Sequence, residues 1–177
     1  MCIRDSSGTV VERYNKGADA IQALKQGKID CVVIDEQPAI KFVEQNTGIR
    51  ILDEEFTLEE YAFVIAKDNT ELLDKVNSVL EKLEADGTIA NIQKNYIGTE
   101  DEIGKFPYES KDVSHENGTL TVGTNAEFPP YESYEDGQIV GIDMDIMRAV
   151  SDELGMELKI EDMAFDSIIC LLYTSDA

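Results

Sequence analysis

Basic side chains are scarce in this sequence, with 15 Lys and Arg residues against 37 Asp and Glu and a formal net charge of −22. Nucleic acids and anionic membrane surfaces both bind through a basic footprint on the protein. The acidic excess argues against both, so we expect no nucleic-acid partner and no direct binding to an anionic membrane.

Residues that carry catalytic or redox chemistry are equally few. The three cysteines, Cys2, Cys31 and Cys170, match no metal or redox spacing. Cys31 lies in the apolar run CVVI, where we expect a small buried hydrophobe. The single histidine, His115, lies in a polar stretch, and no nucleophile–base pair or glycine-rich phosphate loop is found. We therefore expect neither an enzyme nor a bound cofactor.

Acidic residues at Glu127, Asp143 and Asp145 could suggest a metal site. Their spacing lacks the glycine-centred pattern of a calcium loop, and acidic residues are common at the solvated start of a helix. We expect no metal.

Long apolar runs are absent too. No stretch of about 18 apolar residues exists, so the sequence predicts no transmembrane helix. The first residues, MCIRDSSG, hold no apolar core of a signal peptide. Residues 1–8 and residues 170–177 fit badly with their neighbours and resemble translated adapter or vector sequence. We interpret both as non-native ends, with native tails as the alternative.

The apolar fraction of 42% is that of a globular protein with a core, and 177 residues suffice for one domain or for pieces of two. Helical periodicity, caps and turn signals divide the chain. Strands are predicted at 9–15, 29–34, 48–52, 59–67, 119–124 and 156–162. Helices are predicted at 17–27, 36–46, 68–87 (capped by Asp68), 88–98 and 141–155, and a hairpin turn at Asp136-Gly137. The alternation of strand and helix indicates an α/β layer fold with a parallel sheet.

Two stretches resemble a known family. LTVGTNAEFPPYESYEDGQIVGIDMDIMRAVSDELGMELKIEDMAFDSII resembles the first segment of the extracytoplasmic amino-acid-binding proteins of ABC importers, solute-binding protein family 3. A second part of the chain resembles the family's final segment. It consists of ADAIQALKQGKIDCVVIDEQPAIKFVEQN, followed by EEYAFVIAKDNTELLDKVNSVLEKLEADGTIANIQKNYIG. The resemblance implies a periplasmic-binding-protein-like (type II) α/β fold, whose two lobes close on a ligand in the cleft.

The two stretches stand in reverse order, since the family's end comes first. On the resemblance, residues 9–61 are part of lobe two and residues 62–98 are the C-terminal part of lobe one. Residues 99–118 are then a linker, and residues 119–169 are the N-terminal part of lobe one of a following module. Three explanations fit this order: the junction of two modules in tandem, a misjoined or read-through assembly, and a circular permutant.

The resemblance implies capture of a polar amino acid by hinge closure of the two lobes, with no bond made or broken. The implied partner is the membrane permease of an ABC transporter. The implied location is periplasmic or extracellular, with the protein tethered to the membrane or fused to the permease. An arogenate or prephenate dehydratase on the same fold and a sensor domain of a membrane receptor are the alternatives. A dehydratase would need a carboxylic acid–base group facing the cleft, for which the sequence offers no compelling candidate.

Four ligand-binding residues are implied by the resemblance: Asp35, Asn125, Phe128 and Phe165. Asp35 ends an apolar run and would bind the ligand's α-ammonium group, although it could instead cap the next helix or do both. Asn125 would contact the ligand's side chain or ammonium group, or else hydrogen-bond its own backbone.

Phe128 and Phe165 would form opposite walls of the cleft. Phe128 is presented by a loop that Pro129 and Pro130 stiffen, because proline fixes φ. The alternative for Phe128 is a core ring beneath the loop. Tyr131, next in the loop, is expected to serve packing.

The carboxylate of an amino acid calls for an arginine, because a planar guanidinium binds a carboxylate bidentately. In the family this arginine lies in a middle segment that the sequence lacks, and Arg13, Arg50 and Arg148 do not occupy its place. We therefore expect this polypeptide alone to bind amino acids weakly or not at all.

Overall fold

The structure, a computed structural model, describes residues 8–54, 57 and 60–174. The helices are α1 (Gly17–Lys25), α2 (Glu36–Gln45), α3 (Thr70–Ala85), α4 (Thr88–Ile97), α5 (Ile142–Leu154) and α6 (Phe165–Thr174). The strands are β1 (Thr119–Thr124), β2 (Glu127–Phe128), β3 (Glu132–Glu135), β4 (Gln138–Val140) and β5 (Glu157–Asp162). Within these described residues no helix is both long and apolar enough to cross a membrane.

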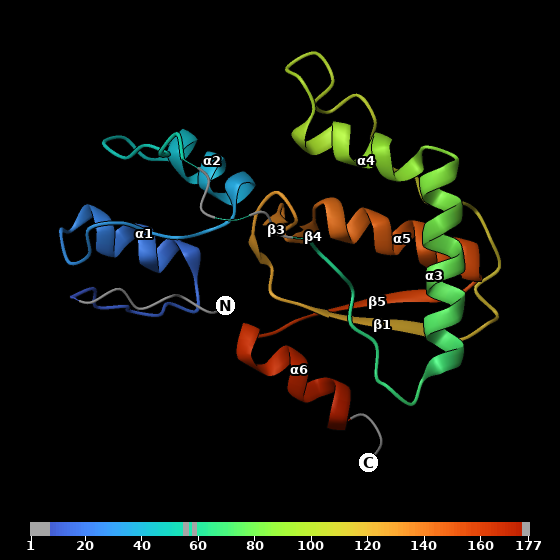
Figure 1. The fold of residues 1–177 in the computed structure, drawn as a ribbon. Helices are drawn as coiled ribbons and strands as arrows, with labels where there is room; N and C mark the ends of the chain where they lie inside the picture. The colour runs from blue at the N-terminus through green and yellow to red at the C-terminus, as the bar shows by residue number, and fades with distance from the viewer. Residues whose placement is uncertain (1–7, 55–56, 58–59, 175–177) are drawn as a thin grey trace.

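Strands β1 and β5 form a parallel pair in register from Thr119 opposite Glu157 to Thr124 opposite Asp162. A parallel pair needs a long crossover, and here it contains the antiparallel sheet β2–β3–β4 and helix α5. Helix α5 covers one side of the pair and α6 the other (Figure 1). Both carboxyl ends of β1 and β5 therefore point to the same edge.

One core joins α5 to α3, α4 and β1. Its fully buried members include Leu83 of α3, Ile92 of α4 and Val150 of α5. Burying a large aliphatic side chain contributes about 1.5–3 kcal/mol, so this core is the main source of stability for the larger part of the molecule. Residues 62–98 and 119–169, which the resemblance assigns to different modules, thus pack together in one lobe.

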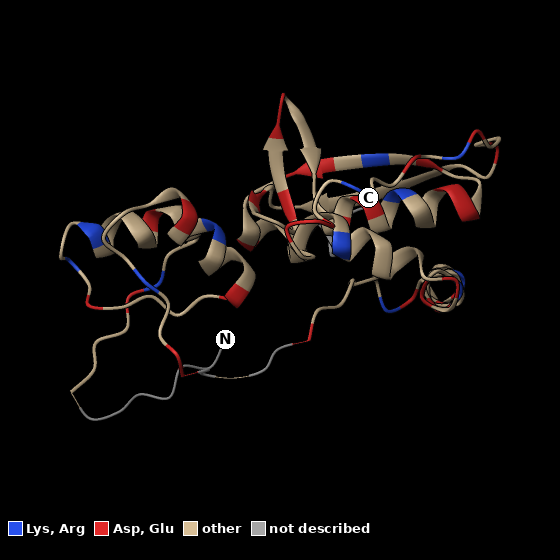
Figure 2. Cartoon of the chain, turned by 90° about the horizontal axis from the view of Figure 1, so that it is seen from above, with Lys and Arg blue, Asp and Glu red and all other residues tan. Residues whose placement is uncertain are grey.

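Helices α1 and α2 pack on each other at the other end of the molecule (Figure 1). Their small core includes Ile21, Ala23 and Phe42. A Cβ added at Gly17 would lie 2.8 Å from Cε2 of Phe42, so only glycine lets the start of α1 come this close. Acidic residues are spread over both parts of the chain, with few basic ones among them (Figure 2).

Four of the predicted strands are wrong: residues 9–15, 29–34, 48–52 and 60–67 form no strand, and residue 59 lies outside the described residues. Val10 is 85% exposed and Val64 is 70% exposed, and Cys31, expected to be buried, is exposed. Apolar runs report only what side chains prefer, whereas a strand also needs a neighbouring strand for its hydrogen bonds. Among the described residues, none of these four segments has a neighbouring strand.

Other local predictions are confirmed. Strand β1 has the predicted bounds, and α5 ends at Gly155 in the left-handed conformation with φ 63°. The hairpin turn between β3 and β4 has positive φ at Asp136 and Gly137, as a two-residue turn requires. The cap of α3 is a correction, because Asn69 rather than Asp68 accepts a hydrogen bond from the backbone N–H of Leu72.

The predicted non-native ends fall mostly outside the described residues, which exclude 1–7 and 175–177. Helix α6 continues through residue 174 and so runs into the stretch from residue 170 onward. The helix that the sequence predicts to be starting at AFDSII therefore extends past that boundary.

Candidate functional site

Three aromatic rings from distant parts of the chain lie in a row. The centroids of Tyr61 and Tyr131 are 4.6 Å apart with the planes tilted by 36°. The centroids of Tyr131 and Phe128 are 5.9 Å apart with the planes at 22°. Tyr131 is therefore the middle ring, and the row links the segment before α3 to the loop after β1.

Asp35 lies at this row. It occupies the N-cap position of α2, but its side chain makes no capping hydrogen bond. Partial desolvation raises the pKa of Tyr61, which is 53% exposed, and of the half-buried Tyr131, and the nearby Asp35 acts in the same direction on each. Polar contacts of Tyr61 with Tyr131 and Asp35 raise the pKa of Tyr61 further. Both phenols remain protonated at neutral pH, so Asp35 lies near two uncharged rings.

The start of α5 fixes the loop that carries Tyr131. The carbonyl oxygens of Pro130 and Tyr131 accept hydrogen bonds from the N–H groups of Ile142 and Asp143, each at 3.1 Å. These N–H groups have no partner inside the helix, and Gly141 has no side chain to cap them, so the loop supplies the acceptors. The ring of Tyr131 is thereby anchored through its own backbone.

Asn125 joins the carboxyl ends of the two parallel strands. Its Nδ2 donates to the carbonyl oxygen of Met163 at 3.0 Å, and the next N–H, of Ala126, donates to Oδ1 of Asp162 at 2.9 Å. The side chain thus bonds the backbone of another segment rather than its own. Phe165 begins α6, is 65% exposed and is not one of the stacked rings.

Two polar contacts join the segment before α1 to this edge of the sheet. Nζ of Lys16 lies 2.6 Å from Oε1 of Glu127, and Nδ2 of Asn15 donates to Oδ2 of Asp166 at 3.1 Å. The Lys16 and Glu127 side chains are 52% and 38% exposed, so solvent screens their attraction. These contacts orient the two ends of the molecule without locking them together.

Two half-buried carboxyl groups, Glu132 on β3 and Asp143 on α5, lie close enough behind the loop to influence each other's pKa. Burial, followed by the neighbouring Asp143, raises the pKa of Glu132 to about 8. Burial raises the pKa of Asp143 to about 6. Like charges in one site disfavour double ionisation, so the pair holds a proton near neutral pH.

The arginines that the structure describes, Arg13, Arg50 and Arg148, are not available at the row. Arg148 forms an ion pair with Asp145 and donates through Nη2 to the carbonyl oxygen of Ile139 at 2.9 Å. Arg13 and Arg50 are exposed on segments outside the sheet. Among the described residues the site therefore offers a carboxylate and aromatic rings, which suit a cation, and no free guanidinium for an anion.

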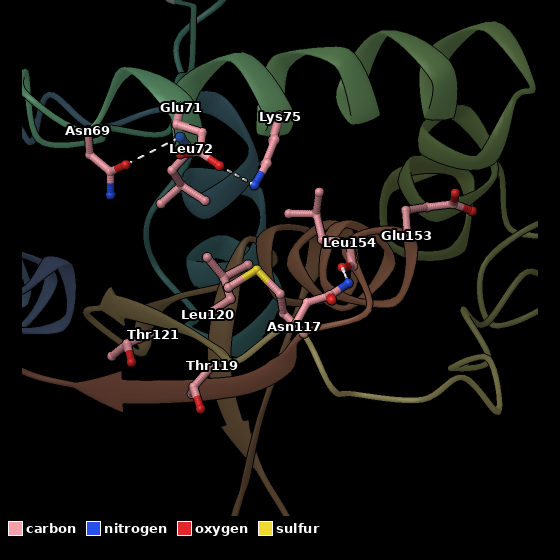
Figure 3. A pocket seen from close by; sticks show the side chains of 11 residues that line it. Asn69, Glu71, Leu72, Lys75, Asn117, Thr119, Leu120, Thr121, Glu153 and Leu154 are labelled. Carbon is pink, nitrogen blue, oxygen red and sulfur yellow. Dashed lines mark hydrogen bonds and ion pairs between the residues drawn. The ribbon is translucent and has the colours of Figure 1, made fainter.

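Two cavities lie elsewhere, on two sides of α3. One of about 720 Å³ opens between α3, the start of β1 and the end of α5 (Figure 3). Its charged groups are paired, Lys75 with Glu71 at 2.6 Å and Glu153 with Lys82 and Lys111, and Asn117 donates to the Leu154 carbonyl oxygen. The cavity therefore offers no unpaired charge among the residues that line it.

The second cavity, of about 420 Å³, runs along the other side of α3 and reaches Tyr61. Neither cavity is lined by any of the four residues implied by the resemblance.

Sequence reasoning missed Tyr61 and undervalued Tyr131. Tyr61 stands at the beginning of the apolar run that follows EE, a position with no local signal for a site. Tyr131 follows two prolines, which marks a rigid loop but not the ring it would meet. Only the folding of residues 60–66 past the loop brings these rings together.

Comparison with known proteins gives a consistent result. The family model for bacterial extracellular solute-binding proteins, family 3, matches residues 8–99 and 120–176. The glutamate-binding protein GluB of Corynebacterium efficiens is 28% identical over 102 residues, covering 54% of this chain and 35% of that protein. The L-cystine-binding protein TcyJ of Escherichia coli K12 is 27% identical over 94 residues, covering 52% and 35%.

Among solved structures, the unliganded open L-cystine solute receptor of Neisseria gonorrhoeae is 30% identical, with a TM-score of 0.33. That match covers 35% of this chain and 27% of the receptor. The chain thus spans about a third of the length of the relatives that it matches.

Proposed function

Because the chain belongs to the bacterial extracellular solute-binding proteins, family 3, we propose that it is part of a protein that captures an amino acid outside the cytoplasmic membrane for an ABC importer. The relatives named above bind glutamate and L-cystine, which supports an amino acid as the ligand class. The membrane partner is then the permease of the importer. No chemical step is involved, and closure of the lobes retains the ligand.

The observation that carries the proposal is the meeting of Asp35 with the rings of Tyr61 and Tyr131. These residues come from both sides of the molecule, since Asp35 precedes α2 and Tyr131 precedes β3. An α-ammonium group placed here would pair with the Asp35 carboxylate and lie against aromatic faces. Phe128 would extend the wall toward the ligand's side chain.

The remaining implied residues take supporting roles in the proposal. Nδ2 of Asn125 already donates to the carbonyl oxygen of Met163. Its ligand contact would therefore be made through Oδ1, which accepts a hydrogen bond. Phe165 is largely exposed and would become a wall only when the lobes close over it. Both assignments predict smaller effects than the removal of Asp35.

The chain alone is expected to bind only one end of an amino acid. A charge-assisted hydrogen bond contributes about 1.5–3 kcal/mol and a cation–π contact about 0.5–2 kcal/mol. Together these approach the roughly 4 kcal/mol that corresponds to a dissociation constant near 1 mM. Without an arginine for the carboxylate, tighter binding is not expected.

This half-site can be tested with probes that carry one end of an amino acid. An amino acid methyl ester keeps the ammonium group, whereas an N-acetyl amino acid keeps only the carboxylate. Titration into the full chain is followed by NMR of the tyrosine rings. The ester is expected to shift the signals of Tyr61 and Tyr131 at millimolar concentration, and the N-acetyl compound is expected to leave them unchanged.

Variants identify the charge that is responsible. Asp35→Asn keeps the shape and removes the charge, and the ester should then lose its effect. Asp30→Asn, an exposed position in the same segment, is the matched control and should bind like the unmodified chain. Equal binding of the two probes, or ester binding that survives Asp35→Asn, would overturn the assignment.

A further inference from the structure

The stretch between the two family matches, residues 100–119, belongs to neither. It includes nearly all of the predicted linker, residues 99–118, which we call the connector. The connector contains no helix or strand. Its backbone is nevertheless hydrogen-bonded at both ends, which a passive tether would not require.

The first half of the connector folds back on α4. The N–H of Gly104 donates to the carbonyl oxygen of Asn95 at 3.0 Å, and the N–H of Phe106 donates to the Asn95 side chain at 3.0 Å. Nζ of Lys94 lies 5.8 Å from the centre of the Phe106 ring. Asn95 of α4 thus accepts hydrogen bonds from two positions of the connector, Gly104 and Phe106.

The second half is bound by the end of α5. The hydroxyl of Tyr108 and the N–H of Lys111 both donate to Oδ2 of Asp152, at 2.7 and 2.8 Å. Nδ2 of Asn117 donates to the Leu154 carbonyl oxygen at 2.7 Å, and its N–H donates to Gly155 at 3.0 Å. Two of these four bonds satisfy the carboxylate of Asp152, and the other two satisfy the carbonyl groups of Leu154 and Gly155 at the end of the helix.

Asp152 is the decisive residue, because it is only 6% exposed. Burying a carboxylate without partners is strongly unfavourable, and both hydrogen bonds to its Oδ2 come from the connector. The adjacent Glu153 binds Lys111 of the connector and Lys82 of α3, so the same turn of α5 also fastens the preceding helix. The end of α5 is therefore complementary to this particular peptide.

We propose that the connector is a docking segment for the C-terminal turn of α5, and that it joins α3 and α4 to β1 and α5 within one chain as a single lobe. The site takes an extended peptide that presents a phenol, a backbone N–H and an ammonium group in that order. The lobe formed this way combines the end of one family segment with the start of the other. This role is independent of any amino-acid ligand.

The experiment must distinguish docking of the connector on α5 from its role as a covalent tether between the helices. A flexible tether of this length still holds its ends at millimolar effective concentration, so loss of a docking contact need not separate the helices. The informative quantity is the protection of the connector itself. Hydrogen exchange of the full chain reports it through the amides of Lys111 and Asn117.

In the unmodified chain we expect both amides to exchange at least about ten-fold more slowly than an unprotected peptide. Tyr108→Phe removes one donor to Asp152 while leaving the carboxylate and the Lys111 bond in place. It should accelerate exchange at Lys111 several-fold and leave the amides in the middle of α5 unchanged. Asp152→Ala removes the acceptor of both bonds and should accelerate both connector amides further.

Glu109→Gln, an exposed connector position, is the matched control and should leave the protection as it is. Unprotected Lys111 and Asn117 amides in the unmodified chain would show a passive linker. Protection that Tyr108→Phe does not change would show that the bond between Tyr108 and Asp152 does not dock the connector, and would overturn the proposal. If Asp152→Ala does not fold, Tyr108→Phe still decides the matter.

Assembly of the lobe within one chain is tested by the molar mass of the protein in solution. Light scattering over an approximately hundred-fold range of concentration should give the monomer mass throughout, because closure inside a chain does not depend on concentration. Dimers that form on concentration and dissociate on dilution would mean that α3 and α4 exchange between copies, and would overturn closure within the chain.

Discussion

The hydroxyl of Tyr96 on α4 donates a 2.8 Å hydrogen bond to Oδ2 of Asp145 on α5, a carboxylate that is 5% exposed. Seven residues later on α5, Asp152 receives the hydroxyl of Tyr108 in the same manner. Seven residues make about two helical turns, so both carboxylates lie along one side of α5. The Tyr96 bond thus joins the two matched family segments, which also pack through apolar side chains, and the Tyr108 bond joins the connector to the second segment.

Tyr96→Phe removes one donor from Asp145 and leaves the ring in place. A buried acceptor that loses a partner costs about 1–3 kcal/mol, and the remaining ion pair with Arg148 places the expected loss near the lower end. Urea denaturation should show a lower midpoint. Tyr134→Phe, whose hydroxyl bond to Asp162 is exposed, should leave the midpoint unchanged; an equal loss in both variants would contradict a special role for Tyr96.

Leu83→Ala tests the apolar contact between α3 and the α5 core. Leu83 is 1% exposed, so truncation leaves a cavity and should lower the free energy of unfolding by about 2–5 kcal/mol. Leu73→Ala on the same helix is the control, because Leu73 is 41% exposed and should change stability by no more than about 0.5 kcal/mol. Similar small losses in both variants would mean that α3 does not pack on α5.

Gly141→Ala tests how the start of α5 holds the aromatic loop. Gly141 has φ 136°, and an added Cβ would lie 2.1 Å from the carbonyl oxygen of Tyr131. The backbone would have to move, so we expect a loss of more than about 2 kcal/mol in thermal unfolding and weaker stacking of Tyr131. Gly137→Ala also has positive φ, at 81°, but open space around it, and should cost only about 1–2 kcal/mol.

Stability should depend on the protonation of Glu132 and Asp143. Both pKa values are raised in the folded state, Glu132 to about 8 and Asp143 to about 6, so the folded state binds more protons than the unfolded state over this range. Below pH of about 4 both carboxyls are protonated in the folded and the unfolded chain, so the free energy of unfolding is highest there with respect to this pair. It falls as pH rises toward about 8, because the unfolded chain loses these protons first.

Glu132→Gln removes the higher of the two titrations. The variant should therefore lose less stability than the unmodified chain between pH of about 6 and 8, as followed by the urea midpoint. Glu135→Gln, on the same strand but exposed, should retain the original pH dependence. A parallel dependence in all three proteins would exclude this pair as its source.

Local signals predicted those parts of the fold whose partners are near in sequence. Asp136-Gly137 predicts its hairpin because the turn itself selects residues with positive φ, and Gly155 ends α5 for the same reason. The run containing Val10 was read as a strand on composition alone, but a strand is completed by a partner that composition does not reveal.

The candidate site shows the same limit. Asp35 and Phe128 could be picked out by their place after apolar runs, which is local information. The meeting of Asp35 with Tyr61 and Tyr131 depends on how residues 60–66 pass the loop, which no short pattern encodes. The connector likewise reads as a polar linker, since nothing near Tyr108 indicates that Asp152 is buried 44 positions away.

The tyrosine–aspartate bonds also give the molecule an optical property. The sequence contains no tryptophan, so its ultraviolet emission comes from tyrosine. An excited phenol is a far stronger acid than one in the ground state, and a hydrogen-bonded carboxylate takes up its proton and extinguishes the emission. Tyr96, Tyr108 and Tyr134 all donate to aspartates. The tyrosine fluorescence of the folded chain should therefore be weak and should increase on unfolding. The intrinsic fluorescence then reports the assembly of the lobe without any added dye.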